Sequence, residues 1–529
     1  MRQSPQDLAR SSRLHAQPTI FSTDFARLQQ PAALASKEFS NCVSPLIRQA
    51  MYLTSVIDER YLWADSLCIT HHDREAALEQ LQSMGAIYAN AVVTIVAADG
   101  DSESGLPGIK GLSCPREMRQ NVIPFGDEQL IVRNTFGLDE MIFFASRPQP
   151  YYSRGWTFQD VWHEETTLYT EIDDEVGPGC DILMAGFPDE WFLGKYIDAY
   201  NQRSLTFSED ALPAISGLLS VLSRSFPGGF VYGIPEMFFD HSLCWRPYFS
   251  RELERRVLST RPIEDRFISS DLPSWSWLGW KGSINTCNDT AIRVNKRQSS
   301  IEEAFPITEW YASNSPTCPQ AKRRRIRSTW YENRDVYKDF TKPMPPGWSR
   351  RDVAAQPPPQ SEPRLYPEGC DRYVFKHESM PEHNGEPLEW FYPFPVHEIQ
   401  VSTPPSVPEQ TQFLFCETVQ AQLSGYRLNT GNVDFPDDWE FRLYDGVGNH
   451  VGKLHPTWDA NKKEYTSQIT KQDFYLVLWI EWVNGVAYRL ASGKVGTLEW
   501  ESLNLENISL VLGLTRAKEN ASNVDFTFT

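Results

Sequence analysis

The sequence lacks the features of membrane-spanning and secreted proteins. No apolar run reaches the roughly 18 residues that a membrane-spanning helix needs, and the first residues show no charged region followed by an apolar one. The 9 cysteines are scattered and include no Cys-x-x-Cys pair, which disfavours a disulfide framework and a zinc ribbon. We therefore expect an intracellular protein, located in the cytoplasm, with reduced thiols and no metal site.

Basic charge and regular repeats are also scarce. The formal net charge of -19 disfavours general binding to nucleic acid, because neutralising phosphates needs a basic face. The sequence contains no P-loop and no repeat of fixed period, so a built-in nucleotide switch that drives assembly is not expected. Any trigger is therefore expected to come from elsewhere.

The chain does contain enough apolar and aromatic residues for several cores. Hydrophobic residues make up 41% and aromatic residues 13% of its 529 residues, a length too great for one ordinary core. The 37 prolines and 30 glycines indicate long irregular connections. We expect two or three packed units joined by loops.

The N-terminal third predicts a poorly ordered segment at 1–40 and an α/β domain at 41–165. Within that domain, amphipathic segments and apolar runs alternate in the order helix, strand, helix, strand: Leu46–Ile57, Tyr61–Ala64, Asp73–Tyr88 and Ala91–Ala98. The continuous run Val92–Val96 is typical of a parallel strand that is buried on both faces. We therefore expect a parallel sheet covered by helices.

The rest of the chain divides by composition into three regions. Residues 166–285 predict a helical extension that ends in a tryptophan-rich junction, and residues 286–370 form a proline- and arginine-rich segment typical of an extended linker. Residues 371–529 alternate apolar and polar positions, and Asn484-Gly485 predicts a tight hairpin. This last region is expected to be mainly β.

The expected linker contains the basic run Lys322–Arg327, with the sequence KRRRIR. Such a run is typical of a nuclear localisation signal or a polyanion-binding patch, and equally of a solvated charge run in a loop. Nuclear localisation through this segment is therefore an alternative to a cytoplasmic location.

Three sequence blocks follow one another in the N-terminal region: Arg60–Ile69 (RYLWADSLCI), Met84–Ala91 (MGAIYANA) and Arg154–Asp160 (RGWTFQD). These blocks resemble, in the same order, the motifs of the fungal heterokaryon incompatibility (HET) domain family. Other segments resemble the downstream region of such proteins: Tyr200–Thr206 with Asp210 and Leu212, Pro273–Trp277 with Gly279 and Trp280, and Trp482–Arg489.

The resemblance implies a fold and a set of candidate site residues. HET domains are similar to TIR domains, with an expected flavodoxin-like parallel sheet, and some TIR domains cleave NAD with one carboxylate. By this resemblance NAD is a candidate substrate, no cofactor is implied, and Asp160 takes the catalytic position. Four further residues are substrate-binding candidates and three are motif residues: Asp65, Arg154, Trp63 and Trp156, then Cys68, Tyr88 and Gln159.

Two departures from the family pattern bear on catalysis. The aromatic first block, of the form Ser-Tyr-x-Trp-Gly, is absent from residues 1–40, so the sheet would lack its first strand. The glutamate that usually ends the third block is Asp160, one methylene shorter, and catalytic placement tolerates only about 0.5 Å. A salt bridge between Asp160 and Arg154 is the structural alternative.

The other candidates also have structural alternatives. Asp65 follows an apolar run, where open α/β sheets bind ligands, but an aspartate there also caps a turn readily. Trp63 and Trp156 are typical core anchors, and Cys68 is expected to be a buried, inert thiol. The segment Pro273–Gly282 is expected to be a packed junction rather than a carbohydrate platform.

Two functional hypotheses follow from these observations. In the first, the chain is an incompatibility protein whose N-terminal domain triggers programmed cell death after non-self recognition, with NAD hydrolysis as one means, while the remaining chain regulates or senses. In the second, it is a catalytically degenerate paralogue that acts as an interaction or scaffold module. Both predict contacts with other incompatibility proteins or self-association.

Overall fold

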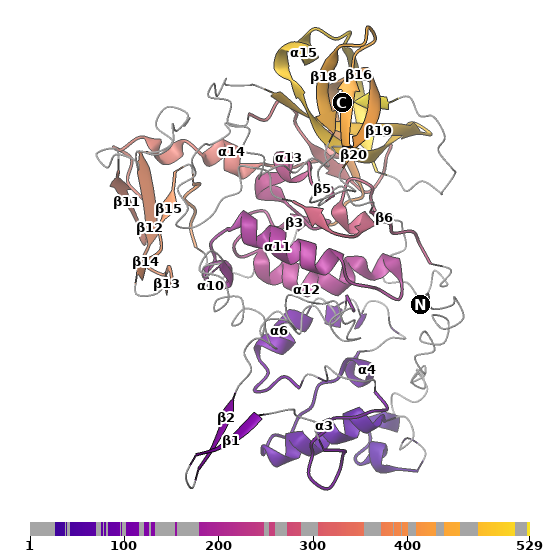
Figure 1. Ribbon diagram of the computed structural model, residues 1–529, viewed down its shortest axis with the longest axis vertical. Coiled ribbons are helices and arrows are strands. Elements are labelled where there is room, and N and C mark those ends of the chain that lie inside the picture. Colours follow the sequence, from indigo (N-terminus) through magenta and orange to yellow (C-terminus); the bar gives the residue numbers. More distant parts are fainter. Residues whose placement is uncertain are drawn as a thin grey trace. The chain divides into compact units, whose positions relative to one another are not determined.

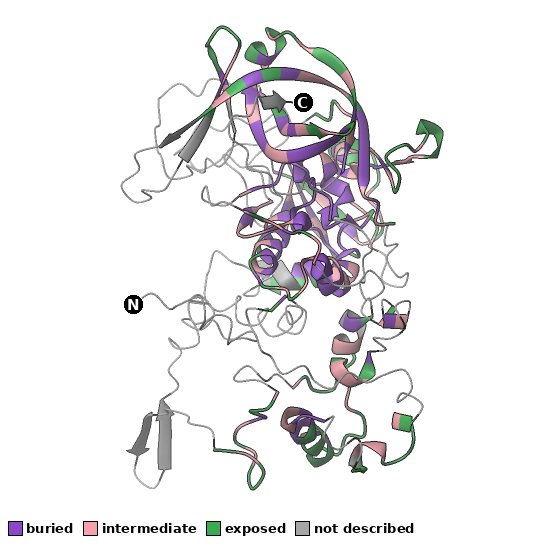
Figure 2. Cartoon of the chain, turned by 90° about the vertical axis from the view of Figure 1, so that its right-hand side faces the viewer, coloured by how far each residue is buried: buried purple, intermediate pink, exposed green. Residues whose placement is uncertain are grey.

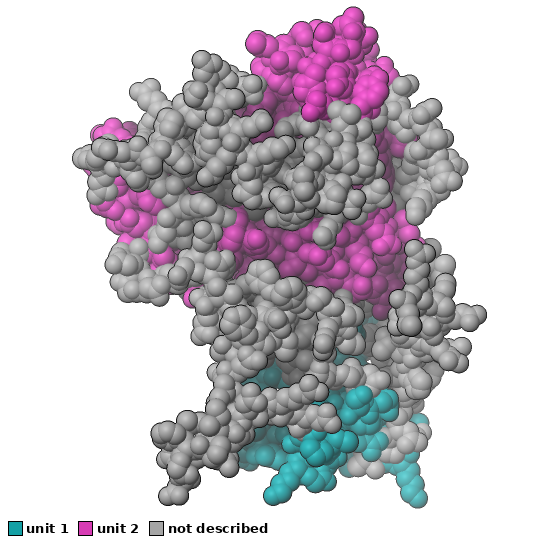
Figure 3. All heavy atoms as spheres, viewed as in Figure 1, with its two compact units in different colours: residues 1–160 teal, residues 161–529 magenta. Residues whose placement is uncertain are grey.

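The computed structural model forms two compact units, residues 1–160 and residues 161–529 (Figure 3). The structure describes residues 27–132 apart from 38, 40–42, 70–72, 74–75, 78, 81–82, 96, 98–101, 116–120 and 126–127. Beyond them it describes 154–155, 179–247, 253–259, 272–286, 305–353, 372–399 apart from 384–385 and 393, 409–429, 439–454, 474–513 and 526–528. Most of the segment 1–40, expected to be poorly ordered, lies outside these residues.

In unit 1 the longest described helix is α3 (Pro45–Val56), close to the range predicted for it. The Ser44 hydroxyl accepts a hydrogen bond from the Ile47 amide at 3.3 Å, and a proline occupies the first helical position. The other described elements of the unit are η1 (Ala33–Ala35), α4 (Asp65–Cys68), α6 (Met84–Ala89), β1 (Asn121–Phe125) and β2 (Glu128–Val132) (Figure 1).

The helix expected over residues 73–88 begins with a capping contact at Asp73. The Asp73 carboxylate accepts a hydrogen bond from the Ala76 amide at 3.1 Å. A turn at Ser83, whose hydroxyl donates to the Glu79 carbonyl at 2.9 Å, then precedes α6. A serine that bonds back to the preceding turn competes with regular helix, so the expected single helix is interrupted at this point.

The expected parallel sheet is not found among the described residues of unit 1, where β1 and β2 pair antiparallel. Residues 61–64 and 91–95 form no strand, and the side chains of Val92 and Val93 are 74% and 57% exposed. The prediction of a doubly buried strand here was therefore wrong for the described residues. An apolar run shows only that burial would be favourable, whereas a strand also needs a neighbour that a local pattern cannot specify.

Unit 2 starts, in its described part, with a helical layer. In α11 (Glu190–Asn201) the Asp189 carboxylate caps the helix by accepting from the Phe192 amide at 3.0 Å, and α12 (Pro213–Leu222) begins with a proline. Buried residues gather in these helices (Figure 2). The smaller helical elements are α10 (Gly179–Met184), η3 (Ser208–Ala211), η4 (Glu236–Phe238), α13 (Phe239–Ser242) and η6 (Trp277–Gly279).

Short antiparallel pairs complete this layer. They are β3 (Phe230–Val231) with β4 (Ile234–Pro235), β5 (Arg246–Pro247) with β8 (Ile284–Asn285), and β6 (Glu254–Arg255) with β7 (Trp280–Lys281). No described helix in either unit is long and apolar enough to cross a membrane.

The C-terminal part of unit 2 is a closed ring of six antiparallel strands (Figure 1). They pair in the order β16, β17, β18, β20, β19 and β22, and β22 pairs again with β16. Their bounds are Phe413–Asn429, Trp439–Tyr444, His450–Leu454, Val486–Gly496, Phe474–Val483 and Phe526–Phe528 in that order. Leu443, Val477 and Val495 fill its core, with Trp500 of α15 (Thr497–Glu501) packed against them. The mainly β character predicted for this region is confirmed.

Further strands extend this ring or lie beside it. β21 (Glu506–Leu512) and β9 (Tyr311–Ser313) pair with β16, and β10 (Arg324–Arg325) pairs with β9. A separate antiparallel sheet contains β11 (Trp348–Asp352), β12 (Tyr373–His377) and β15 (Trp390–Phe391), and a small pair joins β13 (Glu382–His383) to β14 (Glu386–Pro387).

Where it is described, the range 286–370 is folded, unlike the extended linker that its composition suggested. It contains β9, β10, β11, η7 (Gln320–Lys322), α14 (Thr329–Asn333) and η8 (Val336–Lys338). Trp310, Trp330 and Trp348 are only 9%, 8% and 7% exposed. These few large apolar side chains give the segment a buried face, which an average over its many polar residues hides.

Candidate functional site

The first two motif blocks meet through an aromatic pair. The rings of Trp63 and Tyr88 lie edge to face, with centroids 5.8 Å apart and planes at 76°. Trp63 precedes α4 and Tyr88 belongs to α6, so the contact joins the two elements that carry the blocks. Both side chains are half-buried, and the pair is a structural anchor of unit 1.

Asp65 is exposed at the start of α4. Its carboxylate accepts a hydrogen bond from the Ser66 amide at 2.7 Å, a local contact that short acidic side chains make readily. Residues 61–64 form no strand, so Asp65 does not end a described sheet strand. This geometry matches the turn-capping alternative better than a sheet-edge ligand site.

Cys68 closes the same turn. Its Sγ accepts a hydrogen bond from the Ala64 amide at 3.5 Å, and its own amide donates to the Ala64 carbonyl at 2.8 Å. The thiol is exposed rather than a buried core thiol, which differs from the expectation for this residue. Its described contacts are structural.

The third block is described only at Arg154, which is exposed, and Gly155, which is buried. Trp156, Gln159 and Asp160 lie outside the described residues. The catalytic role of Asp160 and its salt bridge with Arg154 therefore both stay predictions.

A glycine-containing loop at 102–115 packs on α3. The buried Gln49 side chain accepts a hydrogen bond through Oε1 from the Leu106 amide. Gly105 has a φ of 70°, and a Cβ there would lie 2.5 Å from that same oxygen. Only glycine meets both demands, so this contact fixes where the loop crosses the helix.

Between α3 and this loop lies a cavity of about 600 Å³. Its lining residues are Tyr52, Leu53, Val56, Ile95, Leu106, Pro107, Gly108, Ile109 and Lys110. Aliphatic side chains are the most numerous in the lining, but nearly half of its exposed surface is polar, and the polar side-chain groups belong to Tyr52 and Lys110. A cavity of this size suits a small group of a ligand or of a protein partner that has both apolar and polar parts.

One wall of the cavity continues onto the surface of the helix. The α3 outer face, defined here as Tyr52 and Val56, which are four positions apart on the helix and both line the cavity, is 41% and 60% exposed. Isolated apolar side chains are common on protein surfaces, but neighbouring ones beside a cavity are typical of an interaction site. This is the feature of unit 1 that the motif residues did not indicate.

Unit 2 contains a buried charged network that the sequence also did not indicate. The His241 Nε2 contacts the Glu190 carboxylate, and its Nδ1 lies 2.8 Å from the Tyr331 hydroxyl. Burial opposes protonation of His241, but the charge of Glu190 outweighs it and raises the pKa of His241. The resulting ion pair joins α11, α13 and α14. Because its members lie 51 and 90 positions apart, no local motif could have revealed it.

The basic run Lys322–Arg327 lies against acidic side chains. Both oxygens of Glu236, a buried side chain, accept hydrogen bonds from Arg324 Nη1 at 2.8 Å. Glu236 Oε1 also accepts a hydrogen bond from the Arg327 amide at 3.2 Å. The run is thus part of a folded element in which Arg324 is paired with a buried carboxylate, and nuclear localisation through it stays a prediction.

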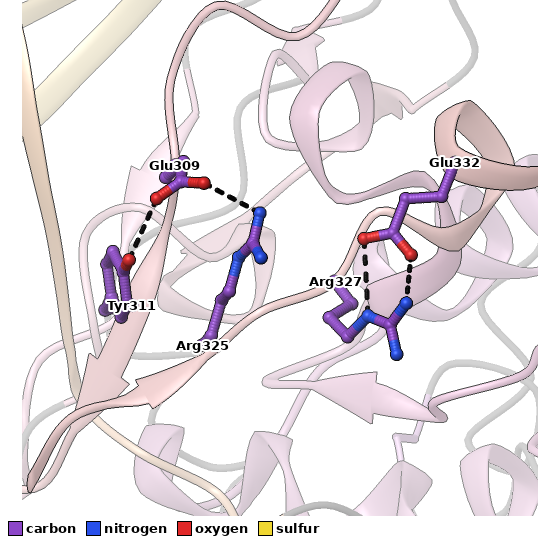
Figure 4. A network of polar contacts seen from close by, with 5 residues as sticks. All are labelled: Glu309, Tyr311, Arg325, Arg327 and Glu332. Carbon is purple, nitrogen blue, oxygen red and sulfur yellow. Dashed lines mark hydrogen bonds and ion pairs between the residues drawn. The ribbon is translucent and has the colours of Figure 1, made fainter.

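Two further ion pairs neutralise the same run (Figure 4). Glu309 accepts from Arg325 at 2.8 Å and from the Tyr311 hydroxyl at 2.9 Å. Arg327 binds Glu332 through two guanidinium nitrogens, and this interaction lowers the pKa of Glu332. Exposed pairs of this kind stabilise little individually, so their main effect is on the charge that the surface presents.

The tryptophan-rich segment is a packed junction, as predicted. Trp275 and Trp277 are 0% and 1% exposed, and their indole nitrogens donate to the carbonyls of Gln412 at 2.9 Å and Gly233 at 3.0 Å. Neither ring offers a face to solvent on which a sugar could stack. Within the part of the chain that is described, no group of three His, Cys, Asp or Glu residues is placed to hold a metal ion.

Comparison with known proteins places the N-terminal region in a described family. Residues 21–160 match the family model described as heterokaryon incompatibility protein (HET). The matched range lies in unit 1 and includes all three motif blocks. No curated protein and no solved structure matches the chain.

Proposed function

Because residues 21–160 carry the heterokaryon incompatibility (HET) domain, we propose that this protein acts in fungal vegetative incompatibility. In that process, recognition of non-self after cell fusion leads to programmed cell death. The family match over unit 1, with the three motif blocks in order, is the observation that carries the proposal.

In this proposal unit 1 triggers cell death, and unit 2 regulates it or senses the trigger. Unit 1 exposes Val56, Tyr61 and Val92 at 60%, 83% and 74%. Unit 1 therefore has apolar surface to offer to partners. Unit 2 also exposes apolar side chains, among them Ile307 and Val447 at 73% and 86%, so this division of roles rests on the family match over unit 1.

Protein contact is the means of action that the geometry supports best. The α3 outer face and the neighbouring cavity together suit a group with apolar and polar parts that belongs to another incompatibility protein or to a further copy of the chain. The contacts described for Asp65 and Cys68 are those of a structural turn, and they add no evidence for chemistry.

Inducible expression in a fungal host tests this proposal. Val56→Asp places a charge on the α3 outer face without disturbing a buried core, so we expect cell death to be lost at equal protein level. Val447→Asp, at a side chain 86% exposed in unit 2, is the matched control and should keep the activity. Equal killing by both variants would contradict action through this face.

Hydrolysis of NAD is a second candidate, motivated by the resemblance to TIR domains and by Asp65 and Asp160. A carboxylate can stabilise the positive charge that develops on a ribose when its glycosidic bond breaks. Nicotinamide release by the concentrated chain, by Asp160→Ala and by Asp160→Glu tests it. Release that is lost in the alanine variant and increased in the glutamate variant would support an enzyme with a shortened carboxylate. No release from any form would leave the interaction function.

A further inference from the structure

Ser328 directly follows the basic run. Arginines stand one, three, four and five positions before it, at Arg327, Arg325, Arg324 and Arg323. Serine kinases with acidic substrate grooves select their substrates by such a charge pattern, in which arginines three and five residues before the acceptor fit carboxylates of the kinase. A nuclear localisation signal would account for the basic residues, but it would give no role to the serine that follows them.

The Ser328 side chain is held by acidic groups of unit 2. Its hydroxyl donates to the Asp240 carboxylate, and its oxygen accepts from the Asp240 amide at 3.4 Å. The segment that carries it, residues 318–334, is called the docked segment below. Glu236 binds this segment at Arg324 and Arg327, and the Tyr331 hydroxyl lies 2.8 Å from His241. Carboxylates thus hold the docked segment at Ser328 and before it, and the His241 imidazole contacts it after Ser328.

We propose that Ser328 is a phosphorylation site for an arginine-directed serine kinase, and that its phosphorylation releases the docked segment from the helical layer of unit 2. In this step Ser328 Oγ attacks the γ-phosphorus of ATP and forms a new P–O bond. The bond to the β–γ bridging oxygen breaks, ADP leaves, and the hydroxyl proton passes to the catalytic carboxylate of the kinase.

Release of the docked segment follows from repulsion between the phosphate and nearby carboxylates in a largely buried place. A phosphoserine carries about two negative charges at neutral pH. In the docked position these charges would face the Asp240 carboxylate, with the Glu236 carboxylate nearby, in a largely buried place. Burial already raises the pKa of Asp240, so this environment disfavours negative charge even before a phosphate is added. The helix that follows, α14, has only five residues and offers little compensation.

Access to the kinase requires transient opening of the docked segment. Ser328 is half-buried, and Ile326 beside it is 5% exposed. The arginines that the kinase would recognise are the more accessible part, with the Arg325 side chain 53% exposed. Modification is therefore expected to be slow in the resting chain and faster when the carboxylate contacts of the docked segment are weakened.

The test uses the full chain, ATP and a purified serine kinase that requires arginine three and five residues before its acceptor. Mass spectrometry should find phosphate on Ser328 in the wild type and in Thr329→Ala, and none there in Ser328→Ala. Hydrogen exchange across 318–334 should then become faster by about tenfold or more, because local opening governs exchange of protected amides. Phosphate on Ser328 without faster exchange would contradict release.

Matched variants separate the effect of opening of the docked segment from the effect of recognition of its arginines by the kinase. Glu236→Gln removes a buried charged partner of Arg324 and should speed phosphorylation about tenfold, whereas Glu332→Gln removes an exposed partner and should change the rate by less than about twofold. If Glu236→Gln fails to fold, Arg324→Gln breaks the same ion pair from its exposed end. Absence of phosphate from Ser328 in the wild type and in the weakened variant would overturn the proposal.

Discussion

The guanidinium carbon of Arg489 lies 3.8 Å from the centroid of the Trp245 ring, and Arg489 Nη2 donates to the Trp245 carbonyl. Both residues are buried, at 1% and 2% exposure, although 244 positions separate them. The pair combines a cation–π contact with a hydrogen bond in a desolvated place. The contact connects Trp245, which follows α13 in the helical layer, to Arg489 in strand β20 of the ring.

Replacement of this arginine should destabilise unit 2. Arg489→Met keeps much of the side-chain volume but removes the charge over the ring and the donor to the carbonyl. We expect the free energy of unfolding to fall by about 3 kcal/mol, measured by urea denaturation. Arg442→Met, at an exposed position of β17, should change it by less than about 0.5 kcal/mol. Similar losses in both variants would contradict a special role of Arg489.

The hairpin between β19 and β20 should depend on its glycine. Asn484 and Gly485 have φ values of 51° and 79°, the left-handed pair that a tight two-residue turn requires. Gly485→Ala should lower the free energy of unfolding by about 1 kcal/mol, because a Cβ disfavours this conformation. Gly446→Ala, at a position whose own φ is not positive and which has open space around it, is the control and should have little effect. Equal melting temperatures of the two variants would argue against this turn geometry.

These results also show what a sequence can and cannot predict. The helix starts near Leu46 and Asp73 and the turn at Asn484-Gly485 were predicted because each depends on residues a few positions apart. The strand at Val92–Val96 was not borne out in its described residues, because a strand depends on a partner elsewhere in the chain. Aromatic anchors in the range 286–370 were hidden by a polar average composition.

The candidate site was predictable only in part, for the same reason. The motif blocks pointed to Trp63 and Tyr88, which the structure brings together. The cavity beside α3 could not be predicted, because Tyr52 and Ile109 belong to separate segments that meet only in the fold. The Glu190–His241 pair likewise joins groups whose ordinary sequence contexts give no sign of a partner.

Stability should depend on pH through His397. Its Nε2 lies 3.0 Å from the Gly186 carbonyl, and burial lowers its pKa below the ordinary value of 6.5. In the unfolded chain this imidazole takes a proton near pH 6.5, whereas in the fold it does so only at lower pH. As pH falls below 6.5 the unfolded state therefore binds more protons, and stability is lost by at most about 1.4 kcal/mol per pH unit for one group.

The comparison of two variants isolates this effect. His397→Gln keeps a donor for the Gly186 carbonyl but cannot titrate, so its stability should fall less between pH 6.5 and 5 than that of the wild type. His450→Gln, at an exposed histidine, should retain the wild-type pH dependence. Urea denaturation across this range measures both, and parallel curves for all three proteins would refute the assignment to His397.

The aromatic pair of unit 1 can be tested by a double-mutant cycle. Trp63→Ala, Tyr88→Ala and the double variant should reveal a coupling of about 1 kcal/mol, as edge-to-face pairs usually do. Tyr61→Ala, at a ring that is 83% exposed beside the pair, should not couple to Tyr88→Ala. Additive losses from Trp63 and Tyr88 would mean that the contact contributes nothing beyond separate burial.

The bonds of the tryptophan-rich junction have a consequence for how the chain is held together. The Trp275 indole donates a hydrogen bond to the carbonyl of Gln412, 137 positions along the chain. The Ser274 amide donates to the carbonyl of Gly513, which is 239 positions along the chain. These hydrogen bonds join segments that are far apart in the sequence, so the two segments should stay together even if the peptide chain between them is cut. A chain nicked once by a protease between residues 286 and 409 should therefore run as a single particle in native buffer and separate into two fragments only in denaturant.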